Sequence, residues 1–177
     1  MKNSGFFIWA VLVTALGASL AAAAGTPAGE KALIEKVIRD NIGWAQTKDR
    51  PLLESTMAQD ERLFIFNPDS EATRGWEQFV KGFDFWLDPR FKATGLDIRD
   101  LRIDFSPSGD AAWWACILDD LYEWDGKAGA WKDTRWTGVL EKRNGKWLIV
   151  QMHFSFASDR VAAEVKAKME AVKKENE

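Results

Sequence analysis

The clearest pattern of apolar and polar positions lies between Trp131 and Ala157. Two runs of strand-forming residues, WKDTRWTGVLEKR and KWLIVQMHFSFA, flank Asn144-Gly145. Asn-Gly favours a two-residue turn because both central residues of a type I′ turn need positive φ. The sequence therefore predicts a β-hairpin in which residue 143 faces 146, 142 faces 147, 140 faces 149, 138 faces 151 and 136 faces 153.

Side chains alternate across a strand, so this register assigns each residue of the hairpin to a face. Both faces are largely apolar, which indicates a hairpin covered on both sides. One face mixes aromatic with polar side chains, as the wall of a ligand pocket does: Trp136, Gly138, Leu140, Trp147, Ile149, Gln151, His153 and Ser155. A bulged turn of three residues would reverse the assignment of Trp136 to Gly138.

The remaining pattern predicts three helices followed by strands. Thr26-Pro27 is typical of a helix start, and apolar residues then recur at helical spacing to Ala45. The other expected elements are a short helix at 49–58, a strand at 62–66, a turn at 67–70, a third helix from Thr73 to Leu87, strands at 96–105 and 110–124, a Gly-rich turn at 125–130 and a charged C-terminal helix at 158–177.

The hairpin also carries a family resemblance. Thr137-x-Val139, the turn Arg143-Asn144-Gly145-Lys146-Trp147 and Gln151-x-His153-x-Ser155 resemble the last two strands of the SnoaL-like branch of the nuclear transport factor 2-like superfamily. The segment is also similar to the association domain of calcium/calmodulin-dependent kinase II, and the order of elements matches from about Glu30 to Ala157. The resemblance implies an α+β cone: three helices in the concave face of a curved, mostly antiparallel sheet, with a cavity between them.

The N-terminus predicts export. Lys2, the apolar run from Phe6 to Leu20 and Ala22-x-Ala24 are typical of a signal peptide cleaved after residue 24, although a membrane anchor is the alternative. Residues 25–157 would then form one SnoaL-like domain, periplasmic or secreted and not membrane-bound after cleavage. The net charge of −3 without a basic patch argues against nucleic-acid binding.

Candidate ligand-binding residues follow from the predicted faces and the resemblance. Ten tryptophans, of which only Trp9 precedes the domain, must fill a core or line a cavity. The pocket expected for a small apolar or aromatic molecule is lined by Trp44, Phe64, Phe79, Phe83, Trp136, Gln151 and His153. A single histidine excludes metal sites built on two or more histidines, and we expect neither a metal nor a cofactor.

Candidate catalytic residues are fewer. His153 suits proton transfer near neutral pH, although a lone histidine on a strand is more often structural. Ketosteroid isomerase relatives need a carboxylate base near the pocket mouth, and Asp69 follows the first strand about where such a base would lie. Their tyrosine constellation is not recognisable here, since Tyr122 is the only tyrosine. Alternation sends Asp119 and Asp120 to opposite faces, and which of them faces the cavity stays open.

Three functions remain at this stage. The first is a small-molecule-binding domain that forms a homodimer through the convex face of the sheet. The second is a lyase or isomerase that moves a proton on a small hydrophobic substrate, with His153 or Asp69 as base. The third is a dimerisation or assembly module that uses the C-terminal helix for its partners.

Overall fold

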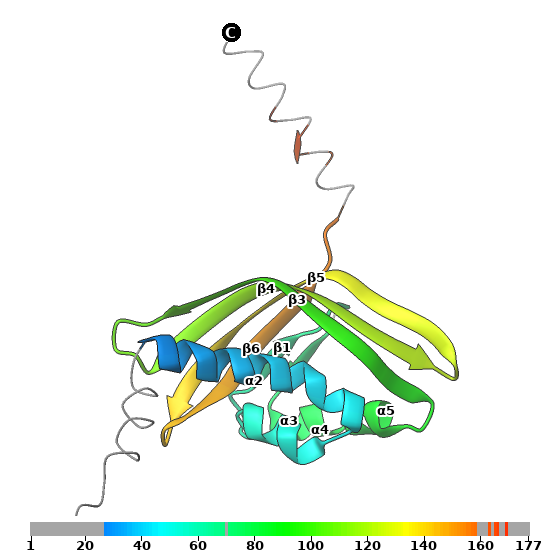
Figure 1. Ribbon diagram of the computed structural model, residues 1–177, viewed down its shortest axis with the longest axis horizontal. Helices are drawn as coiled ribbons and strands as arrows, with labels where there is room; N and C mark the ends of the chain where they lie inside the picture. The colour runs from blue at the N-terminus through cyan, green and yellow to red at the C-terminus, as the bar shows by residue number, and fades with distance from the viewer. Residues whose placement is uncertain (1–26, 70, 159–162, 164, 167–168, 170–177) are drawn as a thin grey trace, which may run out of the picture.

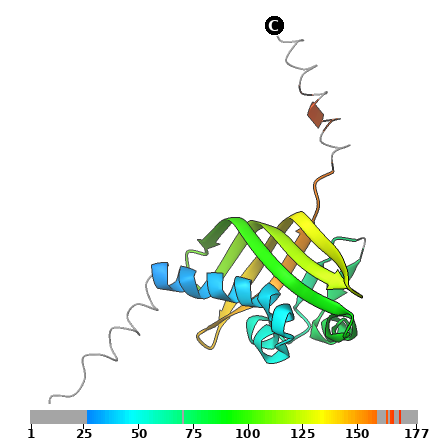
Figure 2. The same cartoon turned by 45° about the vertical axis from the view of Figure 1, so that its right-hand side comes forward.

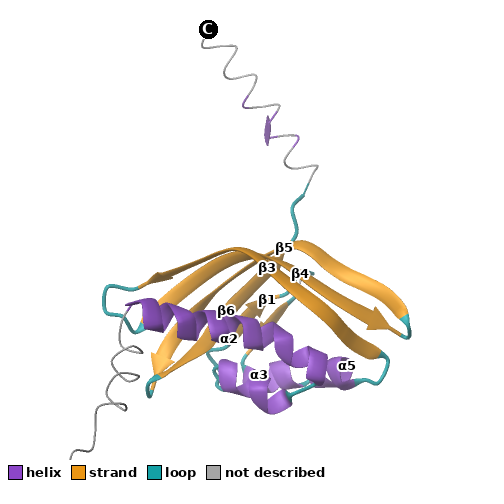
Figure 3. Ribbon diagram, viewed as in Figure 1, coloured by secondary structure: helices purple, strands orange, loops and turns teal. Residues whose placement is uncertain are grey.

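The computed structural model describes residues 27–69 and 71–158, together with 163, 165, 166 and 169. The predicted signal peptide, and most of the predicted C-terminal helix, lie outside these residues. Helices α2 (Pro27–Thr47), α3 (Arg50–Thr56), α4 (Trp76–Val80) and α5 (Phe83–Leu87) lie in the concave face of one curved sheet (Figures 1 and 3). The predicted α+β cone is therefore confirmed.

The sheet has six strands in the order β2-β1-β6-β5-β4-β3. All neighbours are antiparallel except β1 and β6. Long β3, β4 and β5 arch over α2, which runs along the concave side in both views (Figures 1 and 2). The strands are β1 (Phe64–Phe66), β2 (Ala72–Arg74), β3 (Phe91–Phe105), β4 (Ala111–Trp124), β5 (Lys127–Arg143) and β6 (Lys146–Ser155).

Local chemistry explains where the first two helices begin. Pro27 opens α2, where its missing N–H removes no hydrogen bond. Asp49 caps α3, because its carboxylate accepts a hydrogen bond from the backbone N–H of Leu52 at 3.0 Å. The buried positions of α2 are Ile34, Ile38, Asn41 and Trp44. Trp44 packs edge-on against Phe83 and Trp86 of α5.

The third predicted helix is only partly correct. Thr73 lies in β2, a strand that the sequence did not predict, and not at a helix start. The helical segment begins after Gly75, whose φ of 76° is in the left-handed region, and it is divided into α4 and α5 at Gly82. A Cβ at Gly82 would lie 3.0 Å from the Trp86 ring, so glycine lets that indole fold back against the chain.

Two hairpins share one type of turn. Asn144 and Gly145 both have positive φ, of 51° and 78°, as predicted. The expected turn over residues 125–130 is instead a two-residue turn, with φ of 52° at Asp125 and 74° at Gly126. β5 therefore begins at Lys127 and pairs with β4 along its whole length.

The predicted register of the last hairpin is correct as far as Ile149 and wrong beyond it. Leu140 pairs with Ile149, but the next pair is Val139 with Gln151, so Val150 is an extra residue on β6. Such a bulge moves every later side chain to the opposite face. Met152 and Phe154 point to the concave side, whereas Gln151 and His153 point to the convex side.

Candidate functional site

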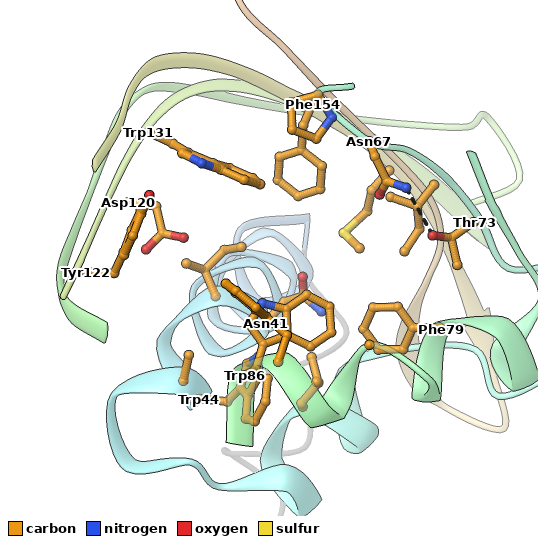
Figure 4. Close-up of a pocket in the computed structure, with 18 of the residues that line it drawn as sticks. Asn41, Trp44, Asn67, Thr73, Phe79, Trp86, Asp120, Tyr122, Trp131 and Phe154 are labelled. Carbon is orange, nitrogen blue, oxygen red and sulfur yellow. Dashed lines mark hydrogen bonds between the residues drawn. The ribbon is translucent and has the colours of Figure 1, made fainter. Parts of the chain in front are cut away.

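A cavity of about 480 Å³ lies between the helices and the concave face of the sheet (Figure 4). Its wall is mostly aromatic and aliphatic, and helices α2 to α5 and strands β1 to β6 all contribute to it or to its edges. The lining residues are Asn41, Ile42, Trp44, Ala45, Leu53, Ile65, Asn67, Pro68, Thr73, Gln78, Phe79, Gly82, Phe85, Trp86, Phe91, Asp120, Tyr122, Trp131, Met152 and Phe154.

Strand bulges direct two of the aromatic side chains into this cavity. The bulge at Val150 turns Phe154 inward, as described above. A second bulge places Lys132 and Asp133 of β5 between the pairs Leu118–Thr134 and Asp120–Trp131. This bulge turns Trp131 inward, and its ring centroid lies 6.4 Å from that of Phe154. The sheet side of the cavity therefore depends on irregular pairing.

The second bulge is held from the convex side. Asp133 adopts a φ of 52°, an unusual value for a residue with a side chain. The carboxylate of Asp119 accepts a hydrogen bond from the Asp133 N–H at 2.8 Å and another from Arg99 Nη2 at 2.8 Å. The Arg99 guanidinium also reaches Asp133 Oδ1 at 3.0 Å. These contacts fix the backbone that carries Trp131.

Two asparagine side chains of the wall donate hydrogen bonds to threonine hydroxyls. Asn41 is buried, and its Nδ2 donates to Thr56 Oγ1 at 2.9 Å. Asn67 Nδ2 donates to Thr73 Oγ1 at 3.2 Å, which joins the end of β1 to β2. Each amide still has a carbonyl oxygen that can accept a hydrogen bond from a ligand.

Asp120 is the charged residue of the wall. Its carboxyl points into the cavity beside Tyr122 and below Trp131 (Figure 4). It has no hydrogen-bond or ion-pair partner among the described residues. Burial raises the pKa of this carboxyl to about 6. Asp119, on the opposite face, is paired with Arg99, which answers the question that the sequence left open.

Tyr122 forms the wall next to Asp120. Its ring stacks on Phe91, with centroids 5.9 Å apart and planes 27° apart. It also lies over the backbone of Gly129, where a Cβ would come within 2.6 Å of the ring. The phenol is therefore positioned by its pairing partner across the strands.

We expect Asp120→Asn to stabilise the protein at pH 8 and not at pH 4. A carboxyl whose pKa is raised on folding destabilises the fold when it is charged, so the cost appears as pH rises from about 4 through 6. The gain at pH 8 should be about 3 kcal/mol in urea unfolding. Asp119→Asn should behave oppositely, because the pKa of Asp119 is lowered, chiefly by the N–H of Asp133. An equal gain at both pH values for Asp120→Asn would contradict this account.

Four of the aromatic residues expected to bind a ligand lie on the concave side of the sheet. Trp44 and Phe79 line the cavity. Phe83 and Trp136 are buried in the core next to it, with Trp136 stacked on Phe154 at 5.7 Å. Gly138 leaves no room for a ligand, since the Trp114 indole fills the space above it.

The other predicted site residues are not brought together in the cavity. Phe64, Gln151 and His153 lie on the convex face, where His153 packs edge-on against Phe66 at 5.8 Å. Asp69 is exposed in the loop between β1 and β2, and accepts a hydrogen bond from the N–H of Glu71. Whether any of these residues contacts a ligand stays a prediction.

Sequence reasoning missed several residues of the wall, notably Asn41, Trp86, Tyr122 and Trp131. Asn41 carried a signal, because it occupies a buried position of the α2 stripe between Ile38 and Trp44. Asp120 carried another, since it shares parity with Trp114, Cys116 and Leu118, all of which are buried. Trp131 had none, because its orientation depends on the bulge at Asp133.

In the part of the chain that the structure describes, His, Cys, Asp and Glu side chains form no group of three suited to a metal ion. The described helices also include none with the length and hydropathy of a membrane span.

The cone of helices in a curved sheet is also the fold of solved structures described as nuclear transport factor 2-like proteins. A family model described as the SnoaL-like domain matches residues 34–159, and the chain belongs to this family. The resemblance seen in the last hairpin is thereby confirmed. No curated protein matches the sequence.

Solved structures show the same fold. A candidate scytalone dehydratase from Novosphingobium aromaticivorans is 14% identical, with a TM-score of 0.64, covering 73% of this chain and 85% of its own. A candidate calcium/calmodulin-dependent kinase II association domain from Xanthomonas campestris is 23% identical, with a TM-score of 0.59 and coverages of 77% and 91%. The corresponding association domain from Caenorhabditis elegans is 17% identical, with a TM-score of 0.55 and coverages of 72% and 95%.

Proposed function

We propose that this domain binds a small, largely apolar molecule in the cavity. The observation that carries the proposal is a space of about 480 Å³ with aromatic walls and one unpaired carboxyl. Small-molecule sites commonly have volumes of about 300–1,000 Å³, apolar linings and a few orienting polar groups. Asn41, Asn67 and Asp120 supply such groups here.

Filling the cavity should abolish binding. Ala45 lies in the wall on α2, so Ala45→Trp places an indole in the space a ligand would occupy. A thermal-shift screen of residues 25–177 against aromatic and alicyclic metabolites should give hits with the wild type, since ligand at a thousand times its Kd stabilises by about 4 kcal/mol. Ala45→Trp should lose these shifts.

Ala32→Trp is the matched control, because Ala32 is exposed on the same helix and lies outside the cavity wall. It should keep every hit. Hits that survive in Ala45→Trp would place the ligand elsewhere, and a stable wild type without hits would contradict ligand binding.

Proton transfer at Asp120 is a second candidate function, in line with the predicted lyase or isomerase. A base is most useful when its pKa lies near the working pH, and that of Asp120 is raised to about 6 by burial. Asp69 is exposed and His153 lies across the sheet, so Asp120 is better placed than either. Ligands from the screen would be incubated in D₂O with the wild type and with Asp120→Asn. Exchange of carbon-bound protons only with the wild type would support catalysis. Equal exchange with both proteins would exclude Asp120 as the base.

The convex face favours assembly with a second copy of this chain. Its side chains form rows across the strands: Trp113, Val139, Gln151 and Phe64, then Ala115, Thr137, His153 and Phe66. Trp113 and Phe66 are 46% and 50% exposed, which is unusual for large apolar residues in neighbouring rows. The related association domains, whose name denotes assembly, support the same use of the fold.

Trp113→Glu should therefore convert a dimer to a monomer, because a carboxylate in an apolar interface is left unpaired. Light scattering after size exclusion would measure the mass at a fixed protein concentration. Leu33→Glu, at an apolar residue 42% exposed on α2, should leave the mass unchanged. A wild type that is monomeric over the whole concentration range would contradict assembly through this face.

We also propose that the protein is exported. The N-terminal pattern supports cleavage after residue 24, and the protein would then act in the periplasm or outside the cell. The N-terminal sequence of protein purified from its native host should begin at Gly25, whereas an intact Met1 would contradict cleavage.

A further inference from the structure

The charge of the cavity wall is unbalanced. Among the twenty lining residues Asp120 is acidic, and none is Lys, Arg or His. Beside Asp120, β3 presents Leu96 and β5 presents Trp131 as its pairing partners. The residues that α2 and α5 contribute to the wall are uncharged. A carboxylate in such surroundings lacks the counter-ion that buried charges normally have.

Aromatic rings surround the same carboxyl. Tyr122 follows it on the same face of β4, and Trp131 lies across from it on β5 (Figure 4). Phe91 extends this wall by stacking on Tyr122. The electron-rich faces of Trp and Tyr attract cations, and quaternary ammonium groups are recognised by such aromatic walls.

We propose that the cavity selects a hydrophobic organic cation, a protonated amine or a quaternary ammonium, with Asp120 as its counter-ion and Tyr122 and Trp131 as its aromatic walls. This inference rests on the proposed ligand-binding function and adds the chemical class of the ligand. A carboxylate or phosphate ligand would meet the charge of Asp120 without a compensating base. A neutral ligand would leave that charge buried and unpaired.

A matched pair of probes tests the charge alone. Benzyltrimethylammonium and neopentylbenzene have the same shape and differ in the replacement of N⁺ by carbon. Titrated against tryptophan fluorescence at pH 7.5, the cation should bind the wild type about tenfold more tightly than the neutral probe, in line with a desolvated cation–π and charge contact. In Asp120→Asn the two probes should bind within about twofold of each other.

The control is Asp104→Asn, which removes a carboxylate on the convex side of β3 that is paired with Arg102. It should keep the tenfold preference. A second measurement uses only the wild type: affinity for the cation should fall as pH is lowered from 7.5 to 5, while affinity for the neutral probe stays constant. The quaternary ammonium does not titrate, and apart from the phenol of Tyr122 no other titratable group lines the cavity.

The outcomes distinguish selection of a cation from ligand binding in the cavity as such. Equal affinity for both probes in the wild type, or a preference that persists in Asp120→Asn, overturns the cation class and leaves ligand binding intact. Failure of both probes to bind also overturns it for aromatic cations, while the metabolite screen with Ala45→Trp still decides whether the cavity binds ligands at all.

Discussion

Deleting Val150 should lower the free energy of unfolding by no more than about 2 kcal/mol. Val150 is the extra residue of the β6 bulge, so without it the pair Val139–Gln151 follows directly on Leu140–Ile149. Met152 and Phe154 therefore keep their places on the concave side. The loss is limited to the Val150 side chain, which is 8% exposed, and to the local twist of the bulge. Urea unfolding followed by tryptophan fluorescence would measure the loss.

Val150→Ala is the control for this deletion. It removes two methyl groups from a residue that is 8% exposed but keeps the chain length and the bulge. Its cost should be roughly 1–2 kcal/mol, about that of the deletion. A deletion that costs several kcal/mol more than Val150→Ala would contradict this account and show that the bulge itself stabilises the fold.

Gly138→Ala should cost about 3 kcal/mol. A Cβ at this position would lie 2.2 Å from the Trp114 ring and 2.3 Å from the backbone carbonyl oxygen of Gln151. The indole is itself buried, and the carbonyl belongs to the neighbouring strand, so neither can move freely. Overpacking of a core typically costs 1–3 kcal/mol, and here both neighbours are rigid. The midpoint of urea unfolding should fall accordingly.

Gly95→Ala provides the comparison, because it introduces the same methyl group into a strand where the nearest side-chain atom, on Leu121, lies at an ordinary 3.7 Å. It should change the unfolding free energy by less than about 1 kcal/mol. Similar losses of unfolding free energy in both variants would contradict this account. They would show that the cost comes from replacing a strand glycine and not from the contact with Trp114.

The sequence predicted the last hairpin turn and the first helix well, because local sequence patterns determine both. Asn144-Gly145 determined the turn and the register next to it, and the apolar spacing of α2 placed Ile34 and Ile38 inward. The family resemblance supplied the arrangement of helices and sheet. β2 was missed because three residues are too short for a recognisable alternation.

The site was predicted less well because it depends on irregularities of pairing. Alternation assumes that each residue of β6 has one partner, and the single extra residue Val150 sent His153 to the convex face. Nothing in the local sequence marks that bulge, since Val is an ordinary strand residue. For Asp119 and Asp120 alternation was correct but lacked a reference point, which the buried Trp114 and Leu118 provide once the structure is known.

The bulge at Asp133 connects contacts on the convex face of the sheet with the position of a side chain on the concave face. Arg99 and Asp119 act on the convex side, yet the residue whose orientation they support, Trp131, lies in the cavity wall. Salt or a docking surface that weakens this ionic contact would therefore alter the environment of an indole on the other side. Trp131 can serve as an internal optical reporter of events on the outer surface of the protein.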